Sequence, residues 1–202
     1  TGVPDSVLKE LSKSLEKNNK RNHIISTNEG SAIGLGIGYY LSTKKIPIIY
    51  MQNSGLSNAL NPLISIAHKK VYSIPLILII GWRGSPKLKD EPQHNVKGKI
   101  TQKILQLLNI KYTIIRNNSD LVKFNKLIKL AKKNKSVVAC LLEQGTLEKT
   151  KSHSRKDYFK LDKEFFLKTL LENINYKTKI ISSTGYNSRE LMYLRQKYKI
   201  KK

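Results

Sequence analysis

A single carboxylate stands directly before a glycine-rich segment, and residues of these types at this spacing could do chemistry. The stretch from Asn28 to Gly38 reads NEGSAIGLGIG, with Glu29 followed by glycines at positions 30, 34, 36 and 38. A phosphate-binding loop requires a Lys-Ser/Thr pair after its last glycine, and the dinucleotide-binding fingerprint requires GxGxxG spacing. The segment has neither, so it does not indicate a phosphate-binding loop.

Three of the glycines, Gly30, Gly34 and Gly38, recur every four residues, which places them on one face of a helix. Each costs about 1 kcal/mol relative to alanine inside a helix, so we expect this face to have a close neighbour, either another helix or a flat ligand. Glu29 stands at the helix start, where the dipole favours a carboxylate. Two explanations of Glu29 are open: an acid that stabilises the helix start, or a buried carboxyl aimed across an interface for proton exchange.

The elements that position these residues alternate as in an α/β protein with a parallel sheet flanked by helices. Short apolar runs predict strands, and periodic segments between them predict helices. The expected strands are HIIST (23–27), IPIIYMQ (46–52), IPLILIIG (74–81), YTIIR (112–116) and SVVACLL (136–142). Helices are expected at about 7–18, 29–41, 57–68, 100–108 and 119–134, with a long polar loop from Trp82 to Gly98. These segments make about five strand–helix units.

The charge of the chain is strongly positive, with 38 Lys and Arg against 14 Asp and Glu and a formal net charge of +24. Clustered cations release counterions from phosphate backbones, so a basic nucleic-acid-binding module is an alternative interpretation. The lysines, however, are spread over the polar sides of the expected helices, as in KFNKLIKLAKKNK, and no nucleic-acid-binding motif is present. We therefore expect no nucleic-acid partner.

Neither the apolar runs nor the cysteine content indicates a membrane or a redox role. The longest apolar run, from Ile74 to Ile80, is far shorter than the roughly 20 residues of a membrane-spanning helix. No basic-then-apolar signal opens the chain, so we expect a cytoplasmic protein without membrane contact. The single cysteine, Cys140, lies in an apolar stretch, and we expect it to be a small buried hydrophobe.

The pattern loosens after Glu143, which suggests a domain boundary. We expect a first domain over 1–143, a charged linker with one amphipathic helix over 144–177, and the beginning of a second α/β domain over 178–202. In that last segment TKIISSTG predicts a strand, and Ser188 is a candidate cap for the helix that follows. The chain begins without Met and ends soon after this unit, so we expect a fragment or a truncated product.

Five motifs occur in order along the chain: GVPDS, NEGSAIGLGIGYYLST, YMQNSGLSNALNPLISIA, GWRG and DEPQH. Together they resemble the pyrimidine-binding domain of the phosphonopyruvate decarboxylase family of thiamine-diphosphate-dependent decarboxylases, a close relative of which is sulfopyruvate decarboxylase. The resemblance is dense over 1–143, and ISSTGYNSRELMYL resembles more thinly the opening of the family's diphosphate-binding domain. It implies decarboxylation of 3-phosphonopyruvate to phosphonoacetaldehyde and CO2 in phosphonate biosynthesis. The alternative substrate is sulfopyruvate, with the chain as an alpha-type subunit.

The resemblance implies roles for residues at the cofactor. Glu29 matches the glutamate that hydrogen-bonds ring nitrogen N1′ of the aminopyrimidine, where a carboxyl is required because it must share a proton in a dry site. Asn53, Ser54 and Gly55 follow a strand and open a helix, so their backbone amides are candidates to meet the cofactor or substrate. A purely structural turn is the alternative for these three.

Three further residues are implied near the substrate. Asp5, in GVPDS, resembles an aspartate that handles protons in related 2-oxo acid decarboxylases, although it could simply cap the helix beginning near Ser6. His94, in DEPQH, falls in the loop where such enzymes carry an active-site histidine, although it could be a solvated loop imidazole. Phosphonopyruvate is more negative than pyruvate, and a guanidinium suits a phosphonate. Arg83, at the end of a strand, is therefore the expected substrate contact.

The resemblance also implies components beyond these residues. The family binds Mg2+ and the diphosphate through a GDG-type motif followed by Asn in its second domain, and no such motif occurs in the 202 residues. We therefore expect no metal ligands here and no activity from the chain alone. A homo-oligomer, at least a dimer, is implied because pyrimidine and diphosphate domains of different subunits meet around each cofactor. A degenerate fragment with only a structural role is the remaining interpretation.

Overall fold

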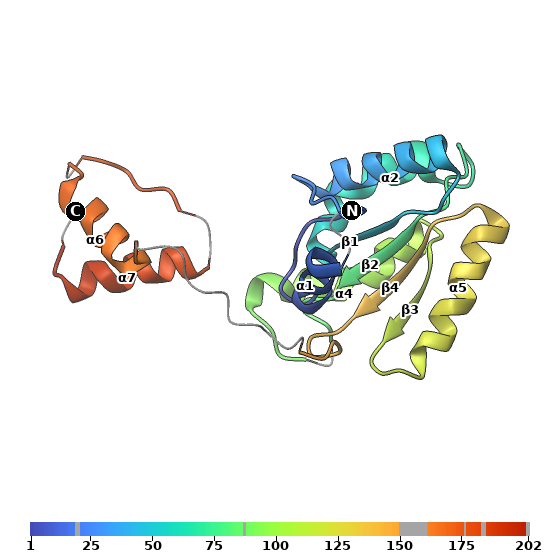
Figure 1. Ribbon diagram of the computed structural model, residues 1–202. Coiled ribbons are helices and arrows are strands. Elements are labelled where there is room, and N and C mark those ends of the chain that lie inside the picture. The colour runs from blue at the N-terminus through green and yellow to red at the C-terminus, as the bar shows by residue number, and fades with distance from the viewer. Residues whose placement is uncertain (19–20, 87, 150–160, 176, 183–184, 201–202) are drawn as a thin grey trace. The chain divides into compact units, whose positions relative to one another are not determined.

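The computed structural model describes residues 1–18, 21–86, 88–149, 161–175, 177–182 and 185–200 (Figure 1). The chain forms two compact units, Thr1–Lys151 and Ser152–Lys202. The first unit carries the sheet and every residue named above as a candidate for the site.

Four parallel strands form the sheet of the first unit, in the order β1-β2-β4-β3. They are β1 (Ile48–Gln52), β2 (Ile77–Gly81), β3 (Lys111–Ile115) and β4 (Val138–Leu142). The last residues of the strands are in register, because Gln52 pairs with Gly81, Gly81 with Leu142 and Ile115 with Leu142. The carboxyl ends therefore lie side by side at one edge of the sheet, the edge where parallel sheets bind ligands.

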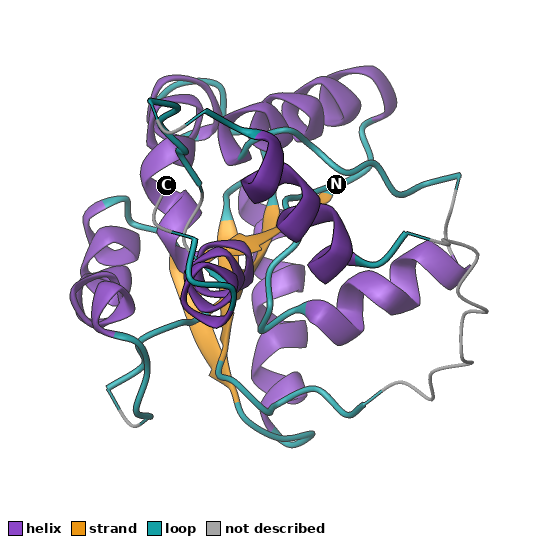
Figure 2. Cartoon of the chain, turned by 90° about the vertical axis from the view of Figure 1, so that its left-hand side faces the viewer, coloured by secondary structure: helices purple, strands orange, loops and turns teal. Residues whose placement is uncertain are grey.

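Helices cover both faces of the sheet, and Figure 2 shows the strands lying between them. One face packs against α2 (Glu29–Thr43), α3 (Leu56–Pro62) with its continuation η2 (Leu63–Ala67), and α4 (Pro92–Leu107). The other face packs against α1 (Lys9–Asn18) and α5 (Asp120–Asn134). Alternate strand residues point to opposite cores. Ile49 and Met51 lie in the first core and Tyr50 in the second, and the expected α/β fold is confirmed.

Cys140 belongs to the core between the sheet and helices α1 and α5. Its side chain is a buried free thiol, and burial raises its pKa to about 12. A thiol held in its neutral form is unreactive. The expectation of a small buried hydrophobe is confirmed.

The predicted strand 23–27 is wrong. Only Ile25 makes a bridge, to Gly2, which itself bridges to Tyr50 of β1. This extension of the sheet stops after one residue because the next position that would continue the pairing is Pro4, which has no N–H to donate. Ile24 and Ile25 remain more than half exposed. The sheet consequently has four strands where five strand–helix units were expected.

The predicted loop from Trp82 to Gly98 is also partly wrong, because α4 begins at Pro92. Proline fits the first position of a helix, where its missing N–H has no partner to lose. His94 therefore lies in the first turn of a helix and not in a loop. Trp82 is buried, and its Nε1 donates to the carbonyl of Gly98 at 3.0 Å.

The second unit contains two helices in its described residues, α6 (Lys163–Asn173) and α7 (Tyr186–Lys197). They pack through Leu167, Leu171 and Leu194. The predicted strand 178–185 is wrong over its described residues 178–182, where Ile181 is 97% exposed and no described strand of this unit offers a pairing edge; residues 183–184 lie outside the described residues.

Ser188 is not the cap of α7, contrary to expectation. Gly185 occupies that position with φ 121°. This backbone conformation is one that glycine adopts readily and a serine would not.

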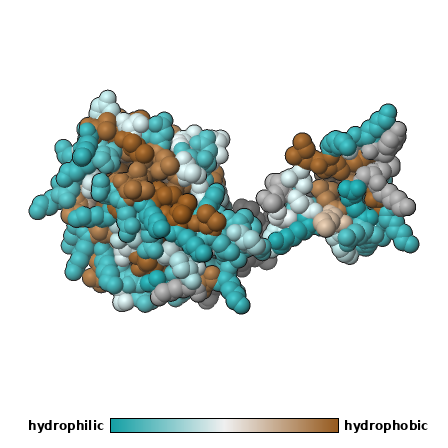
Figure 3. Space-filling model, turned by 180° about the vertical axis from the view of Figure 1, so that it is seen from behind, coloured by the Kyte–Doolittle hydropathy of each residue, from teal (hydrophilic) through white to brown (hydrophobic). Residues whose placement is uncertain are grey.

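Within the described residues, no helix is both long enough and apolar enough to cross a membrane. Apolar side chains nevertheless gather on one face of the first unit (Figure 3). Exposed apolar residues of α2 and η2 are Leu35, Tyr39, Leu41, Ile64 and Ile66.

Candidate active site

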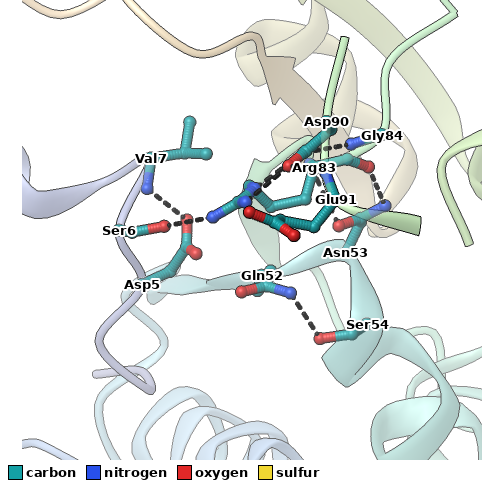
Figure 4. A network of polar contacts seen from close by, with 10 residues as sticks. All are labelled: Asp5, Ser6, Val7, Gln52, Asn53, Ser54, Arg83, Gly84, Asp90 and Glu91. Atoms are coloured by element: carbon teal, nitrogen blue, oxygen red, sulfur yellow. Dashed lines mark hydrogen bonds and ion pairs between the residues drawn. The ribbon is translucent and has the colours of Figure 1, made fainter. Parts of the chain in front are cut away.

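The candidate site lies at the carboxyl edge of the sheet, where the N-terminal segment meets the ends of β1 and β2 (Figure 4). The amide of Val3 donates to the carbonyl of Tyr50 at 3.0 Å, which holds this segment beside β1. The chain then turns at Asp5 and Ser6. As a result Asp5, Asn53 and Arg83, which are far apart in the sequence, come together.

Arg83 is engaged by an ion pair. Its Nε donates to Asp90 Oδ2 at 2.7 Å and its Nη2 to Asp90 Oδ1 at 2.5 Å. Its Nη1 donates to Ser6 Oγ at 2.9 Å. Hydrogen bonds from Arg83 and from the amides of Gly84 and Glu91 hold the pKa of Asp90 well below its usual range, although burial opposes this.

This ion pair changes what the sequence suggested for Arg83. The guanidinium joins the loop after β2 to the N-terminal turn, and Asp90 balances its charge. Three of its five N–H donors make these contacts. The pKa of Arg83 is raised by the hydrogen bond to Asp90 and, to a smaller extent, by the charges of Asp90, Asp5 and Glu91. Substrate binding by Arg83 stays a prediction, in which the side chain would act while held in place by Asp90.

Asp5 is 8% exposed. Its Oδ2 accepts hydrogen bonds from the amides of Val7 at 3.0 Å and Leu8 at 3.3 Å, just before α1. Its Oδ1 is buried and has no hydrogen-bond partner in the part of the chain that the structure describes. Burial raises the pKa of Asp5, while the backbone hydrogen bonds and the Arg83 charge act in the opposite direction. These hydrogen bonds hold the turn that precedes α1 and do not cap the helix itself, which begins at Lys9. The role in proton transfer stays a prediction that the buried oxygen suits.

Asn53 connects β1 to the loop after β2 and to α4. Its Nδ2 donates to the carbonyl of Arg83 at 2.9 Å and to Thr101 Oγ1 at 2.8 Å, and its Oδ1 accepts from the amide of Arg83 at 3.1 Å. The residue is 4% exposed. Its side chain is thus committed to the protein, as the structural alternative predicted. Cofactor binding by the backbone of Asn53 stays a prediction.

Ser54 follows Asn53 in a short turn, Asn53–Gly55, that opens α3. Its Oγ accepts a hydrogen bond from Gln52 Nε2 at 2.9 Å, and its carbonyl accepts one from Ser57 Oγ at 2.8 Å. A role of Ser54 at the cofactor also stays a prediction.

Glu29 is the first residue of α2. Asn28 caps this helix, with its Oδ1 accepting from the amide of Ser31 at 2.8 Å. The Glu29 carboxyl points at α3, where Oε2 accepts from Asn58 Nδ2 at 2.9 Å. It also covers Gly55, because a β-carbon built at Gly55 would overlap the carboxyl. Glu29 is thus both an acid at a helix start and a carboxyl held against a second helix.

The Asn53–Gly55 turn therefore joins two groups of candidate residues. Its first residue, Asn53, donates to the carbonyl of Arg83, and its last residue, Gly55, is covered by the Glu29 carboxyl. Among the described residues, no hydrogen bond connects Glu29 directly to Asp5 or Arg83. The imidazole of His94 also has no partner among these residues, although the His94 backbone packs closely against Gly84.

The glycine stripe on α2 is only partly explained by these contacts. A β-carbon at Gly30 would lie 3.0 Å from the Asn58 carbonyl, so the expected close neighbour is confirmed there as α3. At Gly34 and Gly38, no described atom lies within 4 Å of such a β-carbon. The sequence pattern did not indicate Asn58, Asp90 or a further cluster at the same edge of the sheet.

This further cluster centres on Glu143, which directly follows β4. The residue is 8% exposed, and its carboxyl accepts from Ser85 Oγ at 2.8 Å and from Arg116 Nε at 3.0 Å. The signal that could have found it is its position, since an acid immediately after a fully buried strand reaches the carboxyl edge. The described residues contain no group of three His, Cys, Asp or Glu placed to hold a metal ion.

Comparison with known proteins defines the class. Residues 1–107 match the family model described as "Thiamine pyrophosphate enzyme, N-terminal TPP binding domain". This is more than half of the chain, and the chain belongs to this family.

Curated relatives and solved structures are similar to the chain over different lengths. The chain is 36% identical over 119 residues to a phosphonopyruvate decarboxylase of Streptomyces viridochromogenes, covering 59% of the chain and 29% of that protein. It is 38% identical over 112 residues to the sulfopyruvate decarboxylase subunit alpha of Methanococcus maripaludis, covering 55% of the chain and 65% of that subunit. A benzoylformate decarboxylase structure from Polynucleobacter necessarius shares the fold, with TM-score 0.57, 17% identity, and coverage of 85% of this chain and 32% of that one.

Proposed function

We propose that the chain is the pyrimidine-binding part of a thiamine-diphosphate-dependent decarboxylase that acts on a small anionic 2-oxo acid, with 3-phosphonopyruvate as the preferred substrate. The family match and the relatives named for phosphonopyruvate and sulfopyruvate support this proposal. The single structural observation that carries it is the carboxyl of Glu29, held at the start of α2 against the Asn53–Gly55 turn.

The residues present fit the aminopyrimidine end of the cofactor. Among the described residues, Glu29 Oε1 has no hydrogen-bond donor, so one carboxyl oxygen is free to share a proton with a ring nitrogen. The buried Oδ1 of Asp5, which has no hydrogen-bond partner within the described ranges, is a second group available for a proton at the same edge of the sheet. When bound, thiamine diphosphate supplies a carbon nucleophile for the 2-oxo group and an electron sink for the departing CO2.

The chain's own residues would divide the remaining work. Glu29 holds the pyrimidine ring and its proton. Asp5, with His94 as the second candidate, handles a proton near the substrate, and Arg83 faces its anionic group while Asp90 orients the guanidinium. The groups that hold Mg2+ and the diphosphate are proposed to lie in another domain. Since the chain spans about 29% of the length of the phosphonopyruvate decarboxylases it matches, activity is proposed only for the full-length protein.

We also propose a homo-oligomer, at least a dimer. The exposed apolar residues on α2 and η2 support this proposal, because contiguous apolar surface commonly marks a protein interface (Figure 3). A sedimentation measurement showing only monomers over the working concentration range would contradict it.

The test is Glu29→Gln in the full-length protein. The change keeps size and hydrogen bonding to Asn58 but removes the group that shares a proton, so turnover should fall by about 100-fold or more. Glu16→Gln, an exposed glutamate on α1, is the matched control and should keep normal turnover. Near-normal turnover of Glu29→Gln would overturn the proposal.

The substrate is a separate question. Side-by-side turnover of phosphonopyruvate and sulfopyruvate decides it, because the two compounds differ at the anionic group and share the 2-oxo acid. Faster turnover of sulfopyruvate would move the assignment to the second type, which the relatives support to a similar degree.

A further inference from the structure

The contact between α2 and α3 suggests how the proposed site holds its acid. We infer that Asn58 and Gly55 are positioning residues for Glu29: Asn58 holds one carboxyl oxygen, and Gly55 leaves the space in which the carboxyl lies. The inference rests on the proposed function, in which Glu29 contacts the cofactor. Neither residue needs to touch the cofactor for this role.

Gly55 leaves a space that the Glu29 carboxyl fills. Its backbone has φ −72° and ψ −13°, a helical conformation that alanine adopts without strain. The turn therefore does not require glycine for its conformation. A side chain at this position would instead overlap the γ- and δ-carbons and Oε1 of Glu29. The absence of a side chain at Gly55 is explained by the carboxyl that covers it.

Asn58 is brought within reach by close helix packing. The Asn58 carbonyl lies 3.0 Å from the β-carbon that Gly30 lacks, so the first turn of α2 and the backbone of α3 are nearly in contact. At this separation a short asparagine reaches Glu29 Oε2 at 2.9 Å. Asn28 fixes the start of α2 on the other side. Glu29 is thus held between a capped helix start and a donor from a second helix.

The chemistry of Asn58 suits this task. An amide donates a hydrogen bond without bringing a charge, so it orients the carboxylate without neutralising it as a lysine would. The bond is made to Oε2, and Oε1 is left without a donor among the described residues. One oxygen is therefore anchored while the other is available to the ring nitrogen.

The test compares Asn58→Ala, Asn58→Asp and Gly55→Ala with Glu29→Gln in the full-length protein. We expect Asn58→Ala and Gly55→Ala to lower kcat by about 10- to 100-fold, as misplacement of a catalytic group does, with KM for the 2-oxo acid within about twofold. Asn58→Asp places two carboxylates together, which resist joint ionisation, so the acidic limb of the kcat–pH profile should move to higher pH. A merely structural role of Asn58 would lower stability and leave kcat of the folded Asn58→Ala variant unchanged.

The matched control is Asn61→Ala, one turn further along α3, where the asparagine is exposed and accepts only from Ser65 in the described structure. Fluorescence of Trp82, the single tryptophan, reports whether each variant is folded; Asn58→Asp, which keeps the size of the side chain, carries the test if Asn58→Ala unfolds. Normal kcat and an unshifted profile in the folded Asn58 variants, with Glu29→Gln inactive, would overturn the inference and leave the proposed function standing. Normal turnover of Glu29→Gln would instead overturn both.

Discussion

Arg83 and Asp90 form a two-bonded ion pair across seven residues of one loop, with Nε–Oδ2 and Nη2–Oδ1 distances of 2.7 and 2.5 Å. The carboxylate also accepts from the amides of Gly84 and Glu91, so it closes the loop on itself. The third contact of Arg83, to Ser6, connects this closed loop to the N-terminal turn. The pair therefore positions the turn that carries Asp5.

Asp90→Asn should lower the free energy of unfolding by about 2 kcal/mol at neutral pH, because hydrogen bonds to a charged group are lost. The folded pKa of Asp90 is depressed, so its contribution is present above the unfolded pKa near 3.9 and is lost as pH falls through the folded pKa. Urea unfolding followed by Trp82 fluorescence should show the difference between variant and parent narrowing below about pH 4. Glu148→Gln, an exposed glutamate, gives the control for net charge. A pH-independent difference would count against the ion pair as the cause.

The sequence predicted which strand ends would carry the site but not the contacts between them. The positions of Asn53 and Arg83 followed from two apolar runs that end in polar residues. Their hydrogen bonds depend on the order β1-β2 in the sheet, which periodicity does not determine. The sequence did not indicate Asp90 or Asn58, because neither stands at a strand end. Asp90 acts through Arg83, seven residues away, and Asn58 acts through Glu29, on another helix.

The wrong strand and the partly wrong loop have one physical cause. Each was predicted from the composition of the segment alone, without the pairing partners or the proline position that decide the structure. The apolar run 23–27 has strand-forming residues, but Pro4 removes the donor that would continue pairing. The polar run before Gly98 reads as a loop by composition, and Pro92 begins a helix within it. Both features depend on proline, whose effect is set by its position within an element.

Asn53→Ala should lower the free energy of unfolding by about 3 kcal/mol, because it leaves the N–H and the carbonyl of Arg83 without the Asn53 side chain as partner and removes the hydrogen bond that Thr101 Oγ1 accepts. The measurement is urea unfolding of the first unit by Trp82 fluorescence. Asn61→Ala, the same substitution at an exposed position, should change stability by less than about 0.5 kcal/mol. Equal stabilities of the two variants would mean that the three hydrogen bonds of Asn53 contribute little to the free energy of unfolding. That result would favour a role of Asn53 in ligand binding.

Asp5→Asn should change the pH dependence of stability in the direction opposite to Asp90→Asn. The folded pKa of Asp5 is raised by burial, so its contribution is fully present below the unfolded pKa near 3.9 and is lost as pH rises through the folded pKa. An asparagine does not ionise, so the variant should gain stability relative to the parent as pH rises from about 4 to 7. Unfolding curves at several pH values measure this. Parallel pH profiles would show that the carboxyl titrates as it does in the unfolded chain.

Gly81→Ala should displace the Asp5 carboxyl, because a β-carbon at the end of β2 would overlap Asp5 Oδ2. We expect a loss of about 1–3 kcal/mol from overpacking. Asp5→Ala removes the obstructing oxygen, so in the double variant part of this loss should disappear. Val7 Cβ, 3.1 Å from the same position, keeps the relief incomplete. A double-mutant cycle measured by urea unfolding should therefore give a coupling energy of at least about 0.5 kcal/mol. Additive losses would show that Gly81 does not provide the space for the Asp5 carboxyl.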